Sequence, residues 1–201
     1  MRNAIFLAVL SLMVTAGCST ESTQGAAQGA ASGAVAGAIG GTISALVFGG
    51  DVADAAARGA VWGGSTGAVA GGIQGAHRAE RNQEAAAREE ARQRERLRRE
   101  IGDDAYRGLE ALAECKHTVA IAYAERAQED SDIEYMLAGY WLEIMTVAET
   151  DGEAAAGKLL PILVARDPKL TSTEQAATLV GEAMEELRDI RAQYGMAVSC
   201  A

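Results

Sequence analysis

Cysteine and histidine are the side chains of this sequence best suited to covalent or proton-transfer chemistry, and both are scarce. The chain has three cysteines and two histidines: Cys18, Cys115, Cys200, His77 and His117. It contains no Ser-His-acid series, no HExxH sequence and no phosphate-binding glycine loop. Neighbouring acids, such as Asp103-Asp104 and Glu185-Glu186, are more typical of a solvated helix surface than of a general acid-base pair. We therefore expect neither catalysis nor a cofactor.

The first cysteine ends an N-terminal segment with the organisation of an export signal. A positive start, Met1-Arg2-Asn3, precedes an apolar run over residues 4–14, which is too short to span a bilayer. Small residues then lead into Cys18, and this arrangement resembles the lipobox of bacterial lipoproteins, although Thr15 replaces the commoner leucine. The resemblance implies cleavage before Cys18, its acylation with fatty acids such as palmitate and, because Ser19 follows, an outer-membrane destination. An ordinary signal peptide with an incidental cysteine is the alternative.

Lipidation of Cys18 would leave Cys115 and Cys200 as an even pair. In an oxidising periplasm this pair predicts a disulfide between the first and last helices of the C-terminal part. Closing so long a loop stabilises a fold by about 4 kcal/mol on the chain-entropy model. Two buried free thiols are the alternative. A metal site built on Cys115 and His117 is not expected, because residues two apart on a helix face different directions and further Cys or His ligands are lacking.

Helices must position these side chains, since aromatic content is only 4% and proline is nearly absent. The most regular part of the chain carries glycine at every fourth position, twice. The two series are Gly25, Gly29, Gly33, Gly37 and Gly41, then Gly59, Gly63, Gly67, Gly71 and Gly75. Glycine costs about 1 kcal/mol in a helix against alanine, so a series of them needs a compensating interaction. Close packing of two helix backbones in lipid provides one.

We interpret residues 24–48 and 56–76 as two membrane-seeking helices joined by a polar turn. The first has no charged residue and is long enough to cover about 30 Å of hydrocarbon, but its hydrophobicity is marginal for a lone span. A flexible, low-complexity linker is the alternative. The sequence leaves open whether the two glycine series pack within one chain or between chains.

Two glycine series, joined by a short polar turn and preceded by a lipobox, resemble the two-helix glycine-zipper lipoproteins of bacterial outer membranes, including the rickettsial surface-antigen type. The resemblance covers roughly residues 1–77. It implies a self-associating structural lipoprotein connected with envelope integrity. A lipid on Cys18 and two spans would leave everything after His77 in the periplasm.

Residues 78–100 are rich in Arg, Glu, Gln and Ala, and Leu97 is their only large apolar residue. Pairs of Glu and Arg four residues apart, such as Glu84 and Arg88, are typical of an exposed helix. The sequence therefore predicts a charged helical spacer. A nucleic-acid-binding arm is not expected, because glutamates offset the arginines and the net charge of the chain is −10.

Residues 101–201 show three apolar faces with helical spacing. The faces contain Ile101, Ala105, Leu109, Leu112, Val119 and Tyr123; Ile133, Leu137, Tyr140, Ile144 and Ala148; and Ala176, Val180, Ala183, Leu187, Ile190 and Tyr194. They predict a small bundle of three long helices and one short helix interrupted at Pro161. Ser131 with Glu134, and Thr171 with Glu174, each fit a capping box at a helix start.

The sequence thus predicts an all-α protein. Its parts are a signal peptide (1–17), a lipidated tether (18–24), a glycine-zipper membrane hairpin (25–77), a charged spacer (78–100) and a periplasmic helical bundle (101–201). The favoured function is a structural lipoprotein that forms homo-oligomers through its hairpin. One alternative is a membrane-anchored module whose acidic bundle docks a periplasmic protein. The other is an oligomeric pore, lined by Gln28, Ser32, Ser65 and Gln74.

Overall fold

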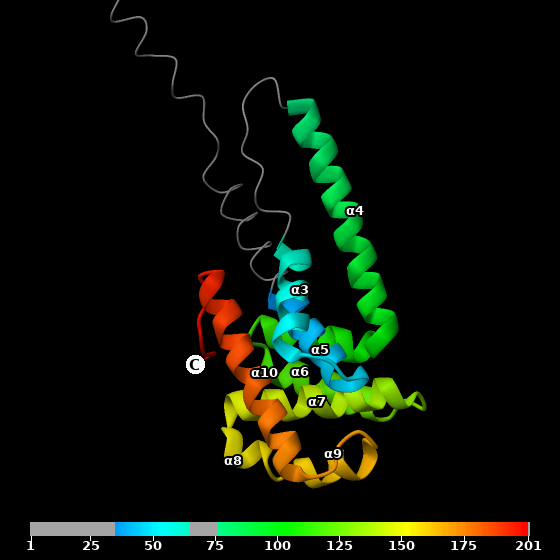
Figure 1. Ribbon diagram of the computed structural model, residues 1–201, viewed down its shortest axis with the longest axis vertical. Coiled ribbons are helices and arrows are strands. Elements are labelled where there is room, and N and C mark those ends of the chain that lie inside the picture. The colour runs from blue at the N-terminus through cyan, green and yellow to red at the C-terminus, as the bar shows by residue number, and fades with distance from the viewer. Residues whose placement is uncertain (1–34, 65–75, 201) are drawn as a thin grey trace, which may run out of the picture.

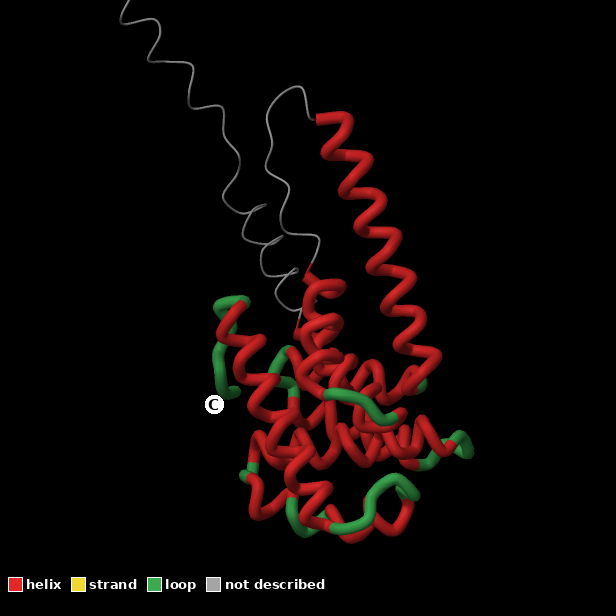
Figure 2. Tube along the Cα trace, viewed as in Figure 1, coloured by secondary structure: helices red, strands yellow, loops and turns green. Residues whose placement is uncertain are grey.

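The computed structural model describes residues 35–64 and 76–200, and every regular element within those ranges is a helix (Figure 1). The helices are a segment over residues 35–48, α3 (Val52–Gly64), α4 (Ala76–Ile101), α5 (Asp103–Ala113), α6 (His117–Gln128), α7 (Ile133–Thr150), α8 (Glu153–Ala156), α9 (Leu160–Arg166) and α10 (Thr173–Gln193). Short loops join α4 to α10 in chain order (Figure 2). The predicted all-α class is confirmed for this part of the chain.

Two helices begin at polar residues that cap them, each one position later than the sequence spacing predicts. The Asp132 side chain accepts hydrogen bonds from the backbone N–H groups two and three residues later, at 3.0 and 3.4 Å, at the start of α7. Ser172 accepts one from the N–H three residues later, at 3.2 Å, at the start of α10. The capping boxes predicted at Ser131 and Thr171 are therefore wrong by one residue, because a neighbouring polar side chain satisfies the same free N–H groups.

Two residues with positive φ separate α4, α5 and α6 from one another. Gly102, at φ 84°, separates α4 from α5, and Cys115, at φ 60°, lies in the turn between α5 and α6. The prediction of one long helix at the start of the bundle is therefore wrong, because its apolar face is divided between α5 and α6, which pack against each other. Val119, predicted to face the core, is 45% exposed as a result.

The predicted interruption at Pro161 is confirmed, although the break falls before the proline. A turn over residues 157–159 separates α8 from α9, and Pro161 lies in the first turn of α9. Proline is tolerated there because the N–H groups of a first helical turn have no partner within the helix.

The bundle is organised around α7, which contacts α5, α6, α8, α9 and α10. Trp141, Leu142, Ile144 and Met145 of α7 are fully buried. Gly139 allows α6 to approach closely, because a Cβ at this position would lie 2.7 Å from the carbonyl oxygen of Ala124. Apolar burial of this extent is the main stabilising term of a helical bundle.

Residues 35–48 and α3 form a helical pair, here called the zipper hairpin, which packs on the bundle beside α10 (Figure 1). Side chains four residues apart on its first helix belong to the same hydrophobic core as the bundle. They are Val35, Ile39, Ile43 and Val47, each at most 1% exposed. The Lys169 Nζ donates a hydrogen bond to the Val47 carbonyl oxygen at 2.7 Å, at the C-terminal end of that helix. The Ser44 hydroxyl donates another to Glu100 of α4, at 3.1 Å.

Among the described residues, no helix combines the length and the apolar character needed to cross a membrane. The predicted membrane hairpin is therefore not supported for residues 35–48 and α3. The apolar face of residues 35–48 is instead packed in the hydrophobic core that the hairpin shares with the bundle. The predicted charged spacer is covered by the helix α4, whose C-terminal end is not fully solvated: a Cβ on Gly40 would lie 2.2 Å from the side chain of Leu97, which packs on the core.

Candidate functional site

Within the zipper hairpin, the two glycine series meet backbone to backbone. A Cβ added to Gly59 would lie 2.0 Å from the carbonyl oxygen of Gly37, and one added to Gly41 would lie 2.2 Å from that of Ala55. No side chain fits at such distances, so this contact needs glycine. Gly37 faces Gly59 and Gly41 faces Ala55, so moving forward by four residues on the first helix means moving back by four residues on the second. The helices are therefore antiparallel, and in this part of the chain the two series pack within one molecule.

Only some of the predicted site residues fall within the described part of the chain. Gly63 lies in α3 with Gly59. The lipidation residue and six glycines lie outside the described residues: Cys18, Gly25, Gly29, Gly33, Gly67, Gly71 and Gly75. The residues predicted to line a pore, Gln28, Ser32, Ser65 and Gln74, lie outside them as well.

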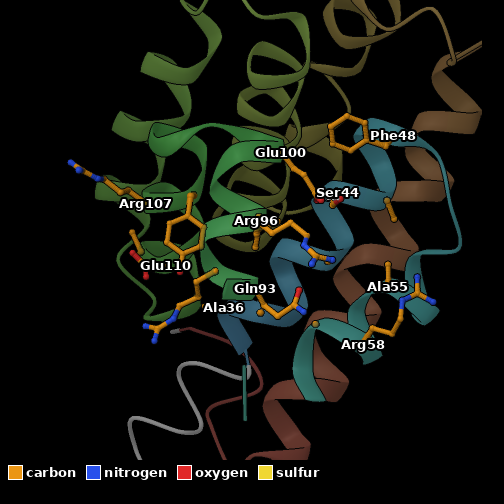
Figure 3. A pocket seen from close by; sticks show the side chains of 18 of the residues that line it. Ala36, Ser44, Phe48, Ala55, Arg58, Gln93, Arg96, Glu100, Arg107 and Glu110 are labelled. Carbon is orange, nitrogen blue, oxygen red and sulfur yellow. Dashed lines mark hydrogen bonds between the residues drawn. The ribbon is translucent and has the colours of Figure 1, made fainter. Parts of the chain in front are cut away.

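An open groove of about 1090 Å³ lies between the zipper hairpin, the C-terminal half of α4, and α5 with the start of α6. Figure 3 shows Arg58 of the hairpin on one side, Arg107 of α5 on the other, and Arg96 of α4 between them. Small residues such as Gly41 and Ala45 form part of the lining. Phe48, at 45% exposed, is a large apolar side chain at its edge.

The groove carries more basic than acidic side chains, in contrast to the net charge of −10 for the whole chain. The charged lining residues are Arg58, Arg94, Arg96, Arg107 and Lys116, with Glu100, Glu110 and Glu114. A surface that combines basic groups with exposed apolar side chains suits a partner that carries both acidic and apolar groups. The basic excess comes from Arg58, Arg94 and Arg96 of the zipper hairpin and α4, which lie outside the predicted acidic bundle of residues 101–201.

Tyr106 is the titratable group of the groove whose proton affinity the fold changes most. It is 6% exposed, and the Arg98 guanidinium lies 5.4 Å from the centre of its ring. Burial, and then the neighbouring Glu110 carboxylate, raise the pKa of the Tyr106 phenol. The phenol therefore stays protonated at neutral pH, where it can donate a hydrogen bond but does not act as a base.

The acid pairs noted in the sequence lie on helix surfaces. Asp103 is held by Arg98 and Arg107, and the hydrogen bond from Arg98 lowers the pKa of the Asp103 carboxyl. Burial raises the pKa of Glu186, and repulsion from Asp189 adds to the effect. Such arrangements shift pKa values through ordinary ion pairing and desolvation.

A second cluster of polar side chains surrounds the disulfide. Cys115 and Cys200, the pair that the sequence predicts, are joined with their Cα atoms 5.5 Å apart, and they link the α5–α6 turn to the tail after α10. His117 begins α6, and its Nε2 lies 3.1 Å from Oε2 of Glu149 on α7. Arg191 of α10, fully buried, forms an ion pair with Glu149 and donates to a backbone carbonyl oxygen of α5 at 3.0 Å.

The sequence pattern does not identify Glu149 or Arg191 as site residues, and it misplaces Cys115. The expectation that Cys115 and His117 share a helix is wrong, because Cys115 lies in a turn and His117 starts the next helix. A signal for Arg191 was present: it follows Met184 by seven residues and Leu187 by four, so it lies on the apolar face of α10. A charge on such a face predicts a buried ion pair. The sequence does not identify Glu149 as its partner.

Residues 1–79 match the family model described as a YMGG-like Gly-zipper. The resemblance to glycine-zipper proteins is confirmed for that segment. No curated protein matches the chain, and no solved structure does.

Proposed function

We propose that the chain is a lipid-anchored, non-enzymatic protein of the bacterial cell envelope that supports outer-membrane structure. Acyl chains on Cys18 hold its N-terminus in the outer membrane, and residues 101–201 lie in the periplasm. The lipobox-like sequence that ends at Cys18 and the glycine-zipper match over residues 1–79 support this anchoring. More than one acyl chain is needed for stable anchoring, and lipoprotein acylation supplies it.

The observation that carries the proposal is the docking of the zipper hairpin on the bundle. The first helix of the hairpin is buried in the bundle core, and the Lys169 hydrogen bond joins its end to the segment before α10. The hairpin is the first described element after the proposed anchor in the chain. A force on the anchor would therefore reach the periplasmic domain through a packed interface, which suits a protein that bridges the membrane and the periplasm.

Self-association through the glycine series belongs to the same proposal. In the described residues, Gly37 packs against Gly59 and Gly41 against Ala55 within one chain. A second molecule would therefore use other parts of the series, or would exchange hairpins with the first so that the same contacts form between chains.

The test compares four forms of the chain in bacteria that lack the wild-type gene: wild type, Cys18→Ser, Gly59→Leu and Gly181→Ala. Gly181 is the matched control, because nothing lies within 4 Å of a Cβ added there. We expect Cys18→Ser to lose fatty-acid labelling and membrane attachment. Gly59→Leu should keep the label but fail to restore the outer-membrane barrier to a large hydrophobic dye, whereas Gly181→Ala should restore it. Absence of acylation in wild type, or full rescue by Gly59→Leu, would contradict the proposal.

The second candidate function is docking of a periplasmic protein, and the groove beside the zipper hairpin favours it. Phe48 is 45% exposed at the edge of the groove, with Arg96 inside it. We expect Phe48→Glu and Arg96→Glu to abolish cross-links to such a partner. Ile162→Glu is the control, because Ile162 is also exposed, at 48%, but does not line the groove. Cross-links that survive both groove variants would exclude this site.

A further inference from the structure

The side chains around the disulfide form a cluster whose polar atoms lie close enough together to hold a metal ion. Ligand atoms of His117, Glu149 and Cys200 all lie within 4.8 Å of one another. Cys115 is bonded to Cys200, so its sulfur lies in the same place. The four residues come from the α5–α6 turn, the start of α6, the end of α7 and the C-terminal tail. Their meeting therefore depends on the folded bundle.

We propose that the disulfide masks a zinc site. When Cys115–Cys200 is reduced, the two thiolates, the His117 imidazole and the Glu149 carboxylate provide four ligands for Zn²⁺. Thiolate sulfur, imidazole nitrogen and carboxylate oxygen are the donors that zinc takes in proteins, and four donors complete its tetrahedral geometry.

The distances fit this geometry. With zinc bonds of about 2.0–2.1 Å to nitrogen and oxygen, those two atoms lie about 3.3 Å apart in a tetrahedral site. His117 Nε2 and Glu149 Oε2 are 3.1 Å apart. With zinc–sulfur bonds of about 2.3 Å, the two sulfurs must move to about 3.8 Å apart. Cys200 lies in the irregular tail after α10, so this movement requires no shift of a helix.

The charges fit as well. The Glu149 side chain is 5% exposed and that of Arg191 is 0% exposed, so their charges need compensation within the protein. Zn²⁺, two thiolates, one carboxylate and the Arg191 guanidinium sum to zero. Arg191 donates hydrogen bonds to Oε1 of Glu149 and, at 3.3 Å, to Oε2, and Oε2 also lies 3.1 Å from Nε2 of His117. Outer contacts of this kind orient metal ligands in proteins.

The conversion is balanced when a dithiol reductant supplies two electrons and two protons to the Cys115–Cys200 bond and itself becomes a disulfide. Each resulting thiol then loses its proton as its sulfur binds the metal, so two protons are released for each zinc bound. In the oxidised chain the sulfurs are bonded to each other and provide no thiolate. The cluster therefore binds zinc in the reduced state alone, and bound zinc protects the thiols from reoxidation.

Cobalt(II) is the probe, because tetrahedral cobalt with thiolate ligands absorbs strongly in the visible and near-ultraviolet ranges. The full chain carries Cys18→Ser, so that Cys115 and Cys200 are its only thiols. After reduction with a phosphine, we expect one cobalt per chain, with thiolate charge-transfer and tetrahedral bands that added zinc removes. The oxidised chain should show neither band.

Variants separate a built site from two loose thiols. His117→Ala and Glu149→Gln should each weaken cobalt binding at least 10-fold. His77→Ala is the matched control, because His77 is the other histidine of the chain, and it should leave the affinity unchanged. Octahedral spectra, no binding by the reduced chain, or equal affinity in His117→Ala would overturn the proposal. Circular dichroism is recorded in parallel, and a reduced chain that unfolds and regains no helix with cobalt or zinc would overturn it too.

Discussion

Replacement of Gly59 by alanine tests whether the two glycine series are in backbone contact. The added Cβ would lie 2.0 Å from the Gly37 carbonyl oxygen, 2.6 Å from its carbonyl carbon and 3.1 Å from the Ala38 Cα. All three are backbone atoms, so no rotamer change can relieve the clash. Ordinary contact begins near 3.4 Å, so the helices would have to separate by about 1 Å or more. Overpacking of this kind costs about 1–3 kcal/mol.

Alanine is also a better helix former than glycine, by about 1 kcal/mol, and this gain would partly hide the clash. Gly181→Ala in α10 measures the gain alone, since nothing lies within 4 Å of its added Cβ. We expect Gly181→Ala to raise the free energy of unfolding by up to about 1 kcal/mol. Gly59→Ala should lie about 1–3 kcal/mol below Gly181→Ala.

The assay is urea unfolding followed by far-ultraviolet circular dichroism, with the difference taken from the transition midpoints at a common m-value. Hydrogen exchange in residues 35–48 would show whether the lost stability is local to the zipper hairpin. If Gly59→Ala stabilises the chain as much as Gly181→Ala does, the two helices are not in contact at this position.

Three further changes probe the bundle. Reduction of Cys115–Cys200, which closes a loop of 85 residues, should lower the free energy of unfolding in urea by about 4 kcal/mol; an unchanged midpoint would contradict this. Arg191→Met leaves the buried Glu149 carboxylate without its cation and should cost about 3–5 kcal/mol, most of which adding Glu149→Leu should recover. Burial raises the pKa of Glu186, so the folded chain binds a proton on this carboxylate more tightly than the unfolded chain does. Stability therefore falls as the pH rises from the unfolded-state pKa of Glu186 through its folded-state pKa. Glu186→Gln should therefore raise the free energy of unfolding by at most about 1 kcal/mol at about pH 7, with a slightly higher melting temperature, and not at about pH 3. An equal gain at both pH values would refute the charge of Glu186 as the cause.

The sequence predicts the helices of this protein because aromatic and proline residues are scarce and apolar residues recur with helical spacing. It also predicts the cysteine pair and the glycine contact, since both depend on residue types with few structural roles. It does not predict where the apolar face of residues 35–48 is buried. Val35, Ile39 and Ile43 have the same spacing whether lipid or protein covers them, and only the fold shows that the bundle does.

Breaks that depend on one residue are harder to predict. Cys115 adopts a positive φ that glycine or asparagine would signal but cysteine does not. The sequence therefore does not predict the α5–α6 turn, and it does not predict that His117 and Glu149 lie in contact. The charge on Arg191 could be placed on an apolar face, but its partner lies 42 residues earlier, and no periodic pattern connects them.

The packing of α10 on α3 has a consequence for the order of folding. The Lys169 hydrogen bond joins residues 122 positions apart, and α10, which contacts α3, is the last helix of the described chain. During synthesis the hairpin emerges long before the helix that packs beside it, so its apolar side chains stay uncovered until most of the chain has followed. The nascent hairpin therefore lacks this cover for most of synthesis, and truncation before α10 should uncover the surface of α3 even though the glycine contact itself is intact.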